Sequence, residues 1–153
     1  MSDPAHVPEP TYADGAAEID MRVLLRASDT GDTISLFEEI TPTGKGPPLH
    51  IHHNADEFFR VLAGQYRLRT GERTYDARSG DTLFVPRGTA HCFLNVGDTP
   101  GRLFMGFVPG GAEALFDWMA ENGMPTGDPD QAAMIKRDFG TEFLGPNPLA
   151  DQS

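Results

Sequence analysis

Three side chains that can bind a metal ion lie close together between residues 44 and 64. His50, His52 and Glu57 each offer a lone pair, from an imidazole nitrogen or a carboxylate oxygen. Imidazole suits zinc, copper, cobalt, iron and nickel, and a carboxylate extends this set towards manganese. The cluster therefore indicates one divalent transition-metal ion and leaves its identity open among these six.

The spacing of these residues fits β-strands. In a strand, side chains at i and i+2 point to the same face, so His50 and His52 face one way while His53 faces the other. Glu57 has the wrong parity for the same strand, but the turn-forming segment 54–56 (Asn-Ala-Asp) allows a new strand to begin at Glu57. We expect two strands to bring the three ligands to one point and His53 to be exposed.

A second stretch, GDTLFVPRGTAHCFLN at residues 80–95, supplies a fourth candidate ligand. Its strand-like TLFV is stopped by Pro86, the chain turns through Arg87 and Gly88, and a new apolar run starts at His91. His91 is the natural fourth ligand. Cys92 alternates away from that face and is expected to be a small buried hydrophobe, since no triad spacing accompanies it.

The same alternation predicts the walls of a pocket around the metal. Phe59 and Val61 share the face of Glu57, and Phe93 and Asn95 share the face of His91. Mostly apolar walls around a few polar groups are typical of small-molecule sites. These four residues are therefore the predicted pocket residues.

The two stretches together resemble a known family. Written as spacings they are G-x5-H-x-H-x4-E-x6-G from Gly44 and G-x5-P-x-G-x2-H-x3-N from Gly80, which match the two cupin motifs at every fixed position. The chain resembles a single-domain cupin, in detail over 44–95 and more loosely over about 22–108. The resemblance implies an all-β fold, a double-stranded β-helix or jelly-roll barrel, with the four ligands inside it around one divalent metal ion.

A narrower resemblance points to a reaction. PPLHIHHNADE leading to VPRGTAH is similar to the small quercetin dioxygenase-like cupins, in which the glutamate matching Glu57 is proposed both to bind the metal and to accept the substrate hydroxyl proton. The resemblance implies a metal-dependent oxygenase (dioxygenase) with Glu57 as a catalytic residue, acting on a small aromatic or enolic compound such as a flavonol or diketone. Two alternatives stay open: a metal-dependent isomerase, cyclase or lyase, and a cupin that binds a small molecule without turnover.

The rest of the chain divides around these motifs. Residues 1–20 are Pro-rich with little apolar periodicity and predict a flexible arm, 21–110 the cupin barrel, and 111–153 short helices with a tail. Helices are predicted for AEALFDWMAENG, ending at Gly123, and for DPDQAAMIKRDFG, capped by Asp128 and ending at Gly140. They are expected to cover one end of the barrel, with a lid over the site or packing on a partner chain as the alternatives.

Composition limits the partners and the location. The chain has 12 basic and 23 acidic residues and a net charge of −11, so nucleic acid and anionic membranes are not expected as partners. A single cysteine excludes an internal disulfide framework, and no signal segment or 18-residue apolar run is seen. We expect a cytoplasmic protein with a small-molecule substrate. By resemblance to paired cupin barrels, we also expect a homodimer.

Overall fold

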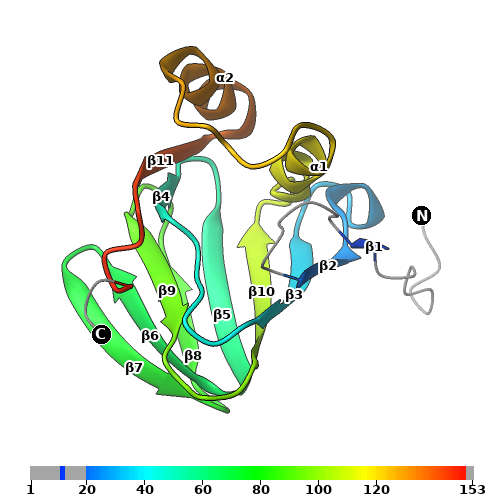
Figure 1. Cartoon of the computed structure of the whole chain (residues 1–153). Helices are drawn as coiled ribbons and strands as arrows, with labels where there is room; N and C mark the ends of the chain where they lie inside the picture. The colour runs from blue at the N-terminus through cyan, green and yellow to red at the C-terminus, as the bar shows by residue number, and fades with distance from the viewer. Residues whose placement is uncertain (1–10, 13–19, 151–153) are drawn as a thin grey trace.

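The computed structural model describes residues 11–12 and 20–150 and shows two antiparallel sheets with two helices at one end (Figure 1). One sheet has the order β1-β2-β3-β10-β5-β8 and the other the order β11-β4-β9-β6-β7. The strands of the first sheet are β1 Thr11–Tyr12, β2 Asp20–Leu25, β3 Ser35–Thr41, β5 Asp56–Ala63, β8 Thr82–Val85 and β10 Gly101–Val108. Those of the second are β4 Leu49–His52, β6 Gln65–Thr70, β7 Arg73–Arg78, β9 His91–Asn95 and β11 Thr141–Gly145.

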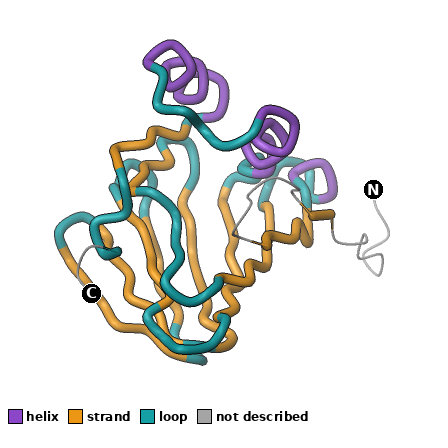
Figure 2. Tube along the Cα trace, viewed as in Figure 1, coloured by secondary structure: helices purple, strands orange, loops and turns teal. Residues whose placement is uncertain are grey.

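The two sheets enclose the main core. Figure 2 shows the strands of both sheets in orange. Alternate residues of β3 and β5 are buried, which is the period-2 pattern of strands with one face towards a core. The expected all-β jelly-roll fold is therefore confirmed. Its fully or nearly fully buried apolar residues are Met21, Val23, Phe37, Phe59, Val61, Tyr66, Leu68, Ala77, Val85, Phe93, Leu103, Met105 and Phe107.

Strand β9 is buried on both faces. Phe93 packs in the core between the sheets, whereas Cys92 and Leu94 pack outside it against Leu49 and Leu149. The C-terminal segment thus covers the outer face of β9. This double covering explains why all five residues of the strand are buried.

Tight turns join neighbouring strands. Gly64, between β5 and β6, has φ of 93°, and a Cβ there would lie 2.9 Å from Cα of Gly101. Glycine is required here both for the backbone angle and for the close approach. The segment 29–32 forms the turn before β3, with a short 3-10 helix η1, Ala27–Asp29, at its start.

Both predicted helices are present: α1 Glu113–Asn122 and α2 Pro129–Phe139. Gly123 ends α1, the side chain of Asp128 accepts a hydrogen bond from the Gln131 amide at the start of α2, and Gly140 ends α2 in the left-handed conformation. The helices lie across one end of the barrel, and the chain then returns as β11 to pair with β4 (Figure 1).

Two sequence expectations concern the chain ends and boundaries. Apart from β1 and the first residue of β2, the predicted arm at 1–20 lies outside the described residues. The turn expected at 54–56 lies one residue earlier, since β5 already begins at Asp56.

Within the described part of the chain, neither helix has the length and apolar character needed to cross a membrane.

Candidate metal centre

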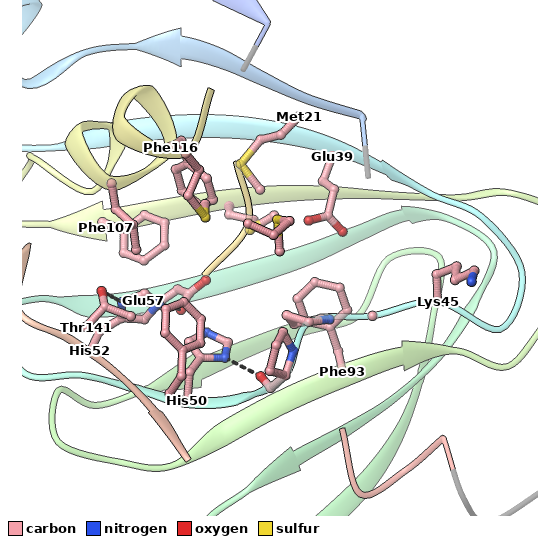
Figure 3. Close-up of a pocket in the computed structure, with 18 residues that line it drawn as sticks. Met21, Glu39, Lys45, His50, His52, Glu57, Phe93, Phe107, Phe116 and Thr141 are labelled. Carbon is pink, nitrogen blue, oxygen red and sulfur yellow. Dashed lines mark hydrogen bonds and ion pairs between the residues drawn. The ribbon is translucent and has the colours of Figure 1, made fainter. Parts of the chain in front are cut away.

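The four predicted ligands meet at one point inside the barrel. His50 and His52 come from β4, Glu57 from β5 and His91 from β9, and one ligand atom from each lies within 4.8 Å of all the others. The site thus spans both sheets, with three imidazoles from one and the carboxylate from the other. Figure 3 shows His50, His52 and Glu57 converging on the same cavity.

Strand register explains the convergence. His50 and His91 are direct partners in the antiparallel pairing of β4 with β9, and their ring centroids are 4.3 Å apart. His52 follows two residues after His50 and so points to the same face. The turn after β4 then carries the chain into the opposite sheet, where Glu57 faces the imidazoles.

Each imidazole is oriented by a hydrogen bond at its Nδ1 atom. The Nδ1–H of His50 donates to the carbonyl of Pro48 at 2.7 Å, and that of His91 donates to the carbonyl of Thr89 at 2.9 Å. Nδ1 of His52 lies 3.3 Å from Oγ1 of Thr141 on β11. These contacts leave the Nε2 atoms to face the cluster, which is the arrangement that holds metal-binding histidines in other proteins.

The electrostatics of the cluster favour a carboxylate and at least one neutral imidazole. Burial raises the pKa of Glu57, but hydrogen bonds from His52 and His91 outweigh it and lower the pKa to about 2. Burial, together with the neighbouring His91 and His52, lowers the pKa of His50 to about 3. Glu57 is therefore ionised and His50 neutral at pH 7, the protonation states that metal ligands need.

This donor set fits a transition-metal ion. Three imidazole nitrogens and one carboxylate oxygen are the ligand types that zinc, iron, copper, nickel, cobalt and manganese accept, and all four side chains lie inside the barrel. In the described structure, Glu57 accepts hydrogen bonds from His52 and His91. The cluster could hold a metal, and its chemistry does not distinguish among these ions.

A cavity of about 430 Å³ opens beside the cluster. This volume is that of a small-molecule site. Its walls come from both sheets, from α1 and from the segment before β4 (Figure 3). The apolar side chains along it are Met21, Phe93, Met105, Phe107, Leu115, Phe116, Met119, Met124 and Phe143, with Pro47 and Pro48.

Helix α1 closes one side of this cavity. Leu115, Phe116 and Met119 all line it, and Phe116 also packs on Phe37 of the barrel core with ring centroids 5.4 Å apart. The expectation that the helices cover one end of the barrel is confirmed. The covered end is the one that holds the four clustered ligands.

The four predicted pocket residues lie at different depths. Phe93 lines the cavity, whereas Phe59 and Val61 are 1% exposed and belong to the core beneath it. Asn95 is also 1% exposed, and its Nδ2 donates to the carbonyls of Thr41 and Thr99. Alternation identifies the inward face of a strand, but it does not indicate which inward residues lie near the cluster.

The two residues predicted to face away from the metal do so. His53 is exposed on the outside of the barrel, where its Nε2 lies 2.7 Å from Oε2 of Glu142. Cys92 is buried in the outer cluster with Leu94, and burial raises the pKa of its thiol to about 11. Neither contributes to the ligand cluster.

Three polar residues of the site were not predicted from the sequence: Glu39, Thr141 and Lys45, which lies in the segment before β4 and lines the cavity. Glu39 on β3 is 2% exposed and lines the cavity, and Thr141 on β11 contacts His52. The alternation of Phe37, Glu39 and Thr41 would have placed Glu39 on the inward face. No local pattern indicates Thr141, because its contact depends on how the segment after α2 returns to the barrel.

A family model described as "Cupin domain" matches residues 36–107, a range that includes all four ligand positions. Residues 36–107 of the chain therefore match the cupin family. Among curated relatives, an uncharacterized protein of Methanocaldococcus jannaschii is 32% identical over 69 residues, covering 45% of this chain and 55% of that protein. Oxalate oxidase 1 of Hordeum vulgare is 34% identical over 77 residues, covering 45% of this chain and 38% of the relative. The matches thus span about half or less of each relative.

Solved cupin structures agree with the fold. KdgF from Halomonas sp. superimposes with a TM-score of 0.60 at 14% identity, covering 68% of this chain and 90% of that one. A predicted oxalate decarboxylase from Thermotoga maritima gives a TM-score of 0.59 at 20% identity, covering 71% and 98%. At these identities the likeness concerns the barrel and not the reaction.

Proposed function

We propose that this cupin holds one divalent transition-metal ion at His50, His52, Glu57 and His91 and is an oxygenase acting on a small aromatic or enolic compound. The observation that carries the proposal is the position of the cluster. Four ligand atoms within 4.8 Å of one another lie beside a cavity of about 430 Å³ whose walls include four phenylalanine and four methionine side chains. A flavonol or a diketone has the size and character that such a cavity accepts.

A metal ion held here would supply a Lewis-acid centre with positions for dioxygen and for an enolate or phenolate oxygen. The protein residues bind and orient. Phe93, Phe107 and Phe143 offer flat apolar surfaces for an aromatic ring, and Phe116 of α1 helps to exclude water.

Glu57 is the candidate proton acceptor. Its Oε2 accepts a hydrogen bond from Nε2–H of His91 at 2.9 Å. The carboxylate is therefore oriented to accept a proton inside the site. The low pKa of Glu57 is caused by the hydrogen bonds from His52 and His91. When these imidazoles serve as ligands they no longer donate to Glu57, so an oxygen of its carboxylate can accept the hydroxyl proton of a substrate.

The apolar character of the cavity walls favours aromatic substrates over small dianions such as oxalate. The oxalate oxidase of Hordeum vulgare is named for oxidising oxalate, which supports oxygen-dependent chemistry on a cupin site. Beside Lys45 and Glu39, the cavity of the present chain is lined mainly by phenylalanine, methionine, leucine and proline side chains. These solvate an aromatic ring far better than a second carboxylate, so we favour an aromatic or enolic substrate over oxalate.

Oxygen uptake tests this proposal. Protein reconstituted separately with iron, manganese, nickel, cobalt, copper and zinc is assayed in an oxygen electrode against a panel of flavonols and diketones. We expect uptake with at least one metal and one substrate, and none with His50→Ala prepared in the same way. Substrate conversion without oxygen uptake would indicate an isomerase, cyclase or lyase instead, and recovery of an unchanged bound compound would indicate a binding protein.

A further inference from the structure

A second carboxyl group lies in the cavity away from the metal cluster. Glu39 on β3 is 2% exposed, lines the cavity, and is not one of the four clustered ligands. Figure 3 shows its carboxyl group directed into the space that His50 and Glu57 also face. A buried carboxyl group is costly unless it has partners, so its contacts matter.

A chain of hydrogen bonds fixes one oxygen of this group. The hydroxyl of Tyr66 donates to Oγ1 of Thr41 at 2.9 Å, and Oγ1 of Thr41 donates to Oε2 of Glu39 at 2.6 Å. Thr41 is itself held by Asn95, whose Nδ2 donates to the Thr41 carbonyl. Oε2 of Glu39 is therefore an acceptor with a defined position.

The other oxygen, Oε1, faces the cavity. Among the described residues no hydrogen bond or ion pair is made by Oε1 of Glu39. Within the same residues, every fully buried side-chain nitrogen or oxygen has a hydrogen-bond partner. Oε1 is therefore not fully enclosed by protein, and the space open to it is the cavity.

The surroundings of Glu39 favour its neutral, protonated form. Burial raises its pKa to about 8, with the charge of Glu57 adding to the rise and the hydrogen bond from Thr41 opposing it. Because Thr41 already donates to Oε2, the carboxyl proton belongs on Oε1. A neutral carboxyl group kept protonated by an apolar site acts as a hydrogen-bond donor to a ligand oxygen.

We propose that Glu39 is a specificity-determining residue that donates a hydrogen bond from Oε1 to an oxygen of the ligand, at a point remote from the ligand's metal-binding end. The inference rests on the proposed function and narrows its substrate class. The ligand would be an aromatic or enolic compound with oxygen atoms at two separated places, one pair for the metal and one acceptor for Glu39. The apolar side chains of Met21, Phe93 and Met105 would contact the part between them.

Two flavonol probes distinguish binding at the metal end of the ligand from binding at Glu39. Quercetin and 3-hydroxyflavone share the same 3-hydroxy-4-keto group, but quercetin also has hydroxyl groups on its outer rings. Affinities of both are measured by anaerobic absorbance titration of metal-loaded wild type, Glu39→Gln and Glu39→Leu, with metal content checked for each. Loss of one hydrogen bond should reduce the quercetin/3-hydroxyflavone affinity ratio in Glu39→Leu by roughly 3- to 10-fold. Glu39→Gln should keep most of the ratio, because its amide still donates.

An infrared measurement of the Glu39 carboxyl group needs only one variant, Glu39→Gln, which has nearly the same shape as wild type. The difference spectrum of wild type minus Glu39→Gln should contain the carbonyl band of a neutral carboxylic acid, and the band should shift with quercetin but not with 3-hydroxyflavone. Three results would overturn the role of Glu39 and leave the proposed function standing. These are an unchanged affinity ratio in Glu39→Leu, an equal fall of the ratio in the two variants, and a carbonyl band that does not shift when quercetin binds. If neither flavonol binds metal-loaded wild type, the aromatic substrate class and the role of Glu39 both fail.

Discussion

Nε2 of His91 lies 2.9 Å from Oε2 of Glu57, at the centre of the ligand cluster. Because Nδ1–H of His91 already donates to the carbonyl of Thr89, Nε2 must carry a second proton to donate to the carboxylate. A metal ion that binds Nε2 of His91 must displace this proton. Proton and metal compete for the same atoms.

This competition predicts proton release on metal binding. Burial lowers the pKa of His91, but its hydrogen bond to Glu57 and the charge of Glu57 raise the pKa above 6.5. We expect most of a proton to be released per metal bound near pH 6, and progressively less as the pH rises through the raised pKa. Calorimetric titration in buffers of different ionisation enthalpy measures this number. Release that does not depend on pH would contradict the pairing of His91 with Glu57.

The same pair predicts a pH window for the stability of the metal-free protein. The raised pKa of His91 contributes stability that is fully present below about pH 6.5 and is lost as the pH rises through that raised value. The pKa of Glu57, lowered from 4.5 to about 2, contributes stability that is present above about pH 4.5 and is lost as the pH falls towards 2. The stability difference between wild type and Glu57→Gln should be largest between these limits.

Urea unfolding of chelator-treated protein at several pH values measures the difference. Glu142→Gln is the matched control, because Glu142 pairs with the exposed His53 and not with the cluster. Its effect should be small across the whole range. A Glu57→Gln difference that grows above pH 8 would show that the pair is not ionic.

Thr141 should tune metal affinity without being a ligand. Its Oγ1 lies 3.3 Å from Nδ1 of His52, and it is 3% exposed. Thr141→Val keeps the shape and removes the hydroxyl, so we expect roughly a 10-fold loss of metal affinity, in the range seen for residues that orient ligands. Thr141→Ser should restore most of it. Competition with a chelating dye gives both affinities, and equal affinity in the valine variant and wild type would refute the role.

Glu113 should fasten α1 to the barrel. Its Oε1 accepts from the Ala27 amide and its Oε2 from the Ser35 hydroxyl, both at 2.6 Å. Glu113→Ala leaves both donors without this partner, so we expect a loss of about 1–3 kcal/mol in the free energy of unfolding. Glu121→Ala, at the exposed end of the same helix, is the control. Urea titration measures the free energy of unfolding of both variants. Equal values would show that the hydrogen bonds of Glu113 do not stabilise the packing of α1 on the barrel.

The sequence was sufficient for the ligand cluster because alternation in strands and the cupin motif spacing agree on the same residues. Alternation correctly directs His53 and Cys92 away from the metal. It was not sufficient for the pocket, because inward-facing Asn95 lies deep in the core, where it holds Thr41. Position along the barrel depends on sheet register and on what the helices cover, and neither can be obtained from one strand.

Contacts between distant segments were also beyond the sequence. Thr141 reaches His52 because β11 pairs with β4 after two helices, with Thr141 opposite His52 in the register. Glu39 lies on a strand whose pattern was visible, but its place beside the metal cavity follows from the pairing of β3 with β10 in the facing sheet. These long-range pairings are properties of the assembled barrel.

Metal stoichiometry tests the central claim most directly. Wild type, His53→Ala and His50→Ala are reconstituted with the same transition metal, desalted and measured by elemental analysis. We expect about one ion per chain in wild type and in His53→Ala, and almost none in His50→Ala. Equal metal content in His50→Ala and His53→Ala, or far less than one ion in reconstituted wild type, would contradict a metal centre formed by His50, His52, Glu57 and His91.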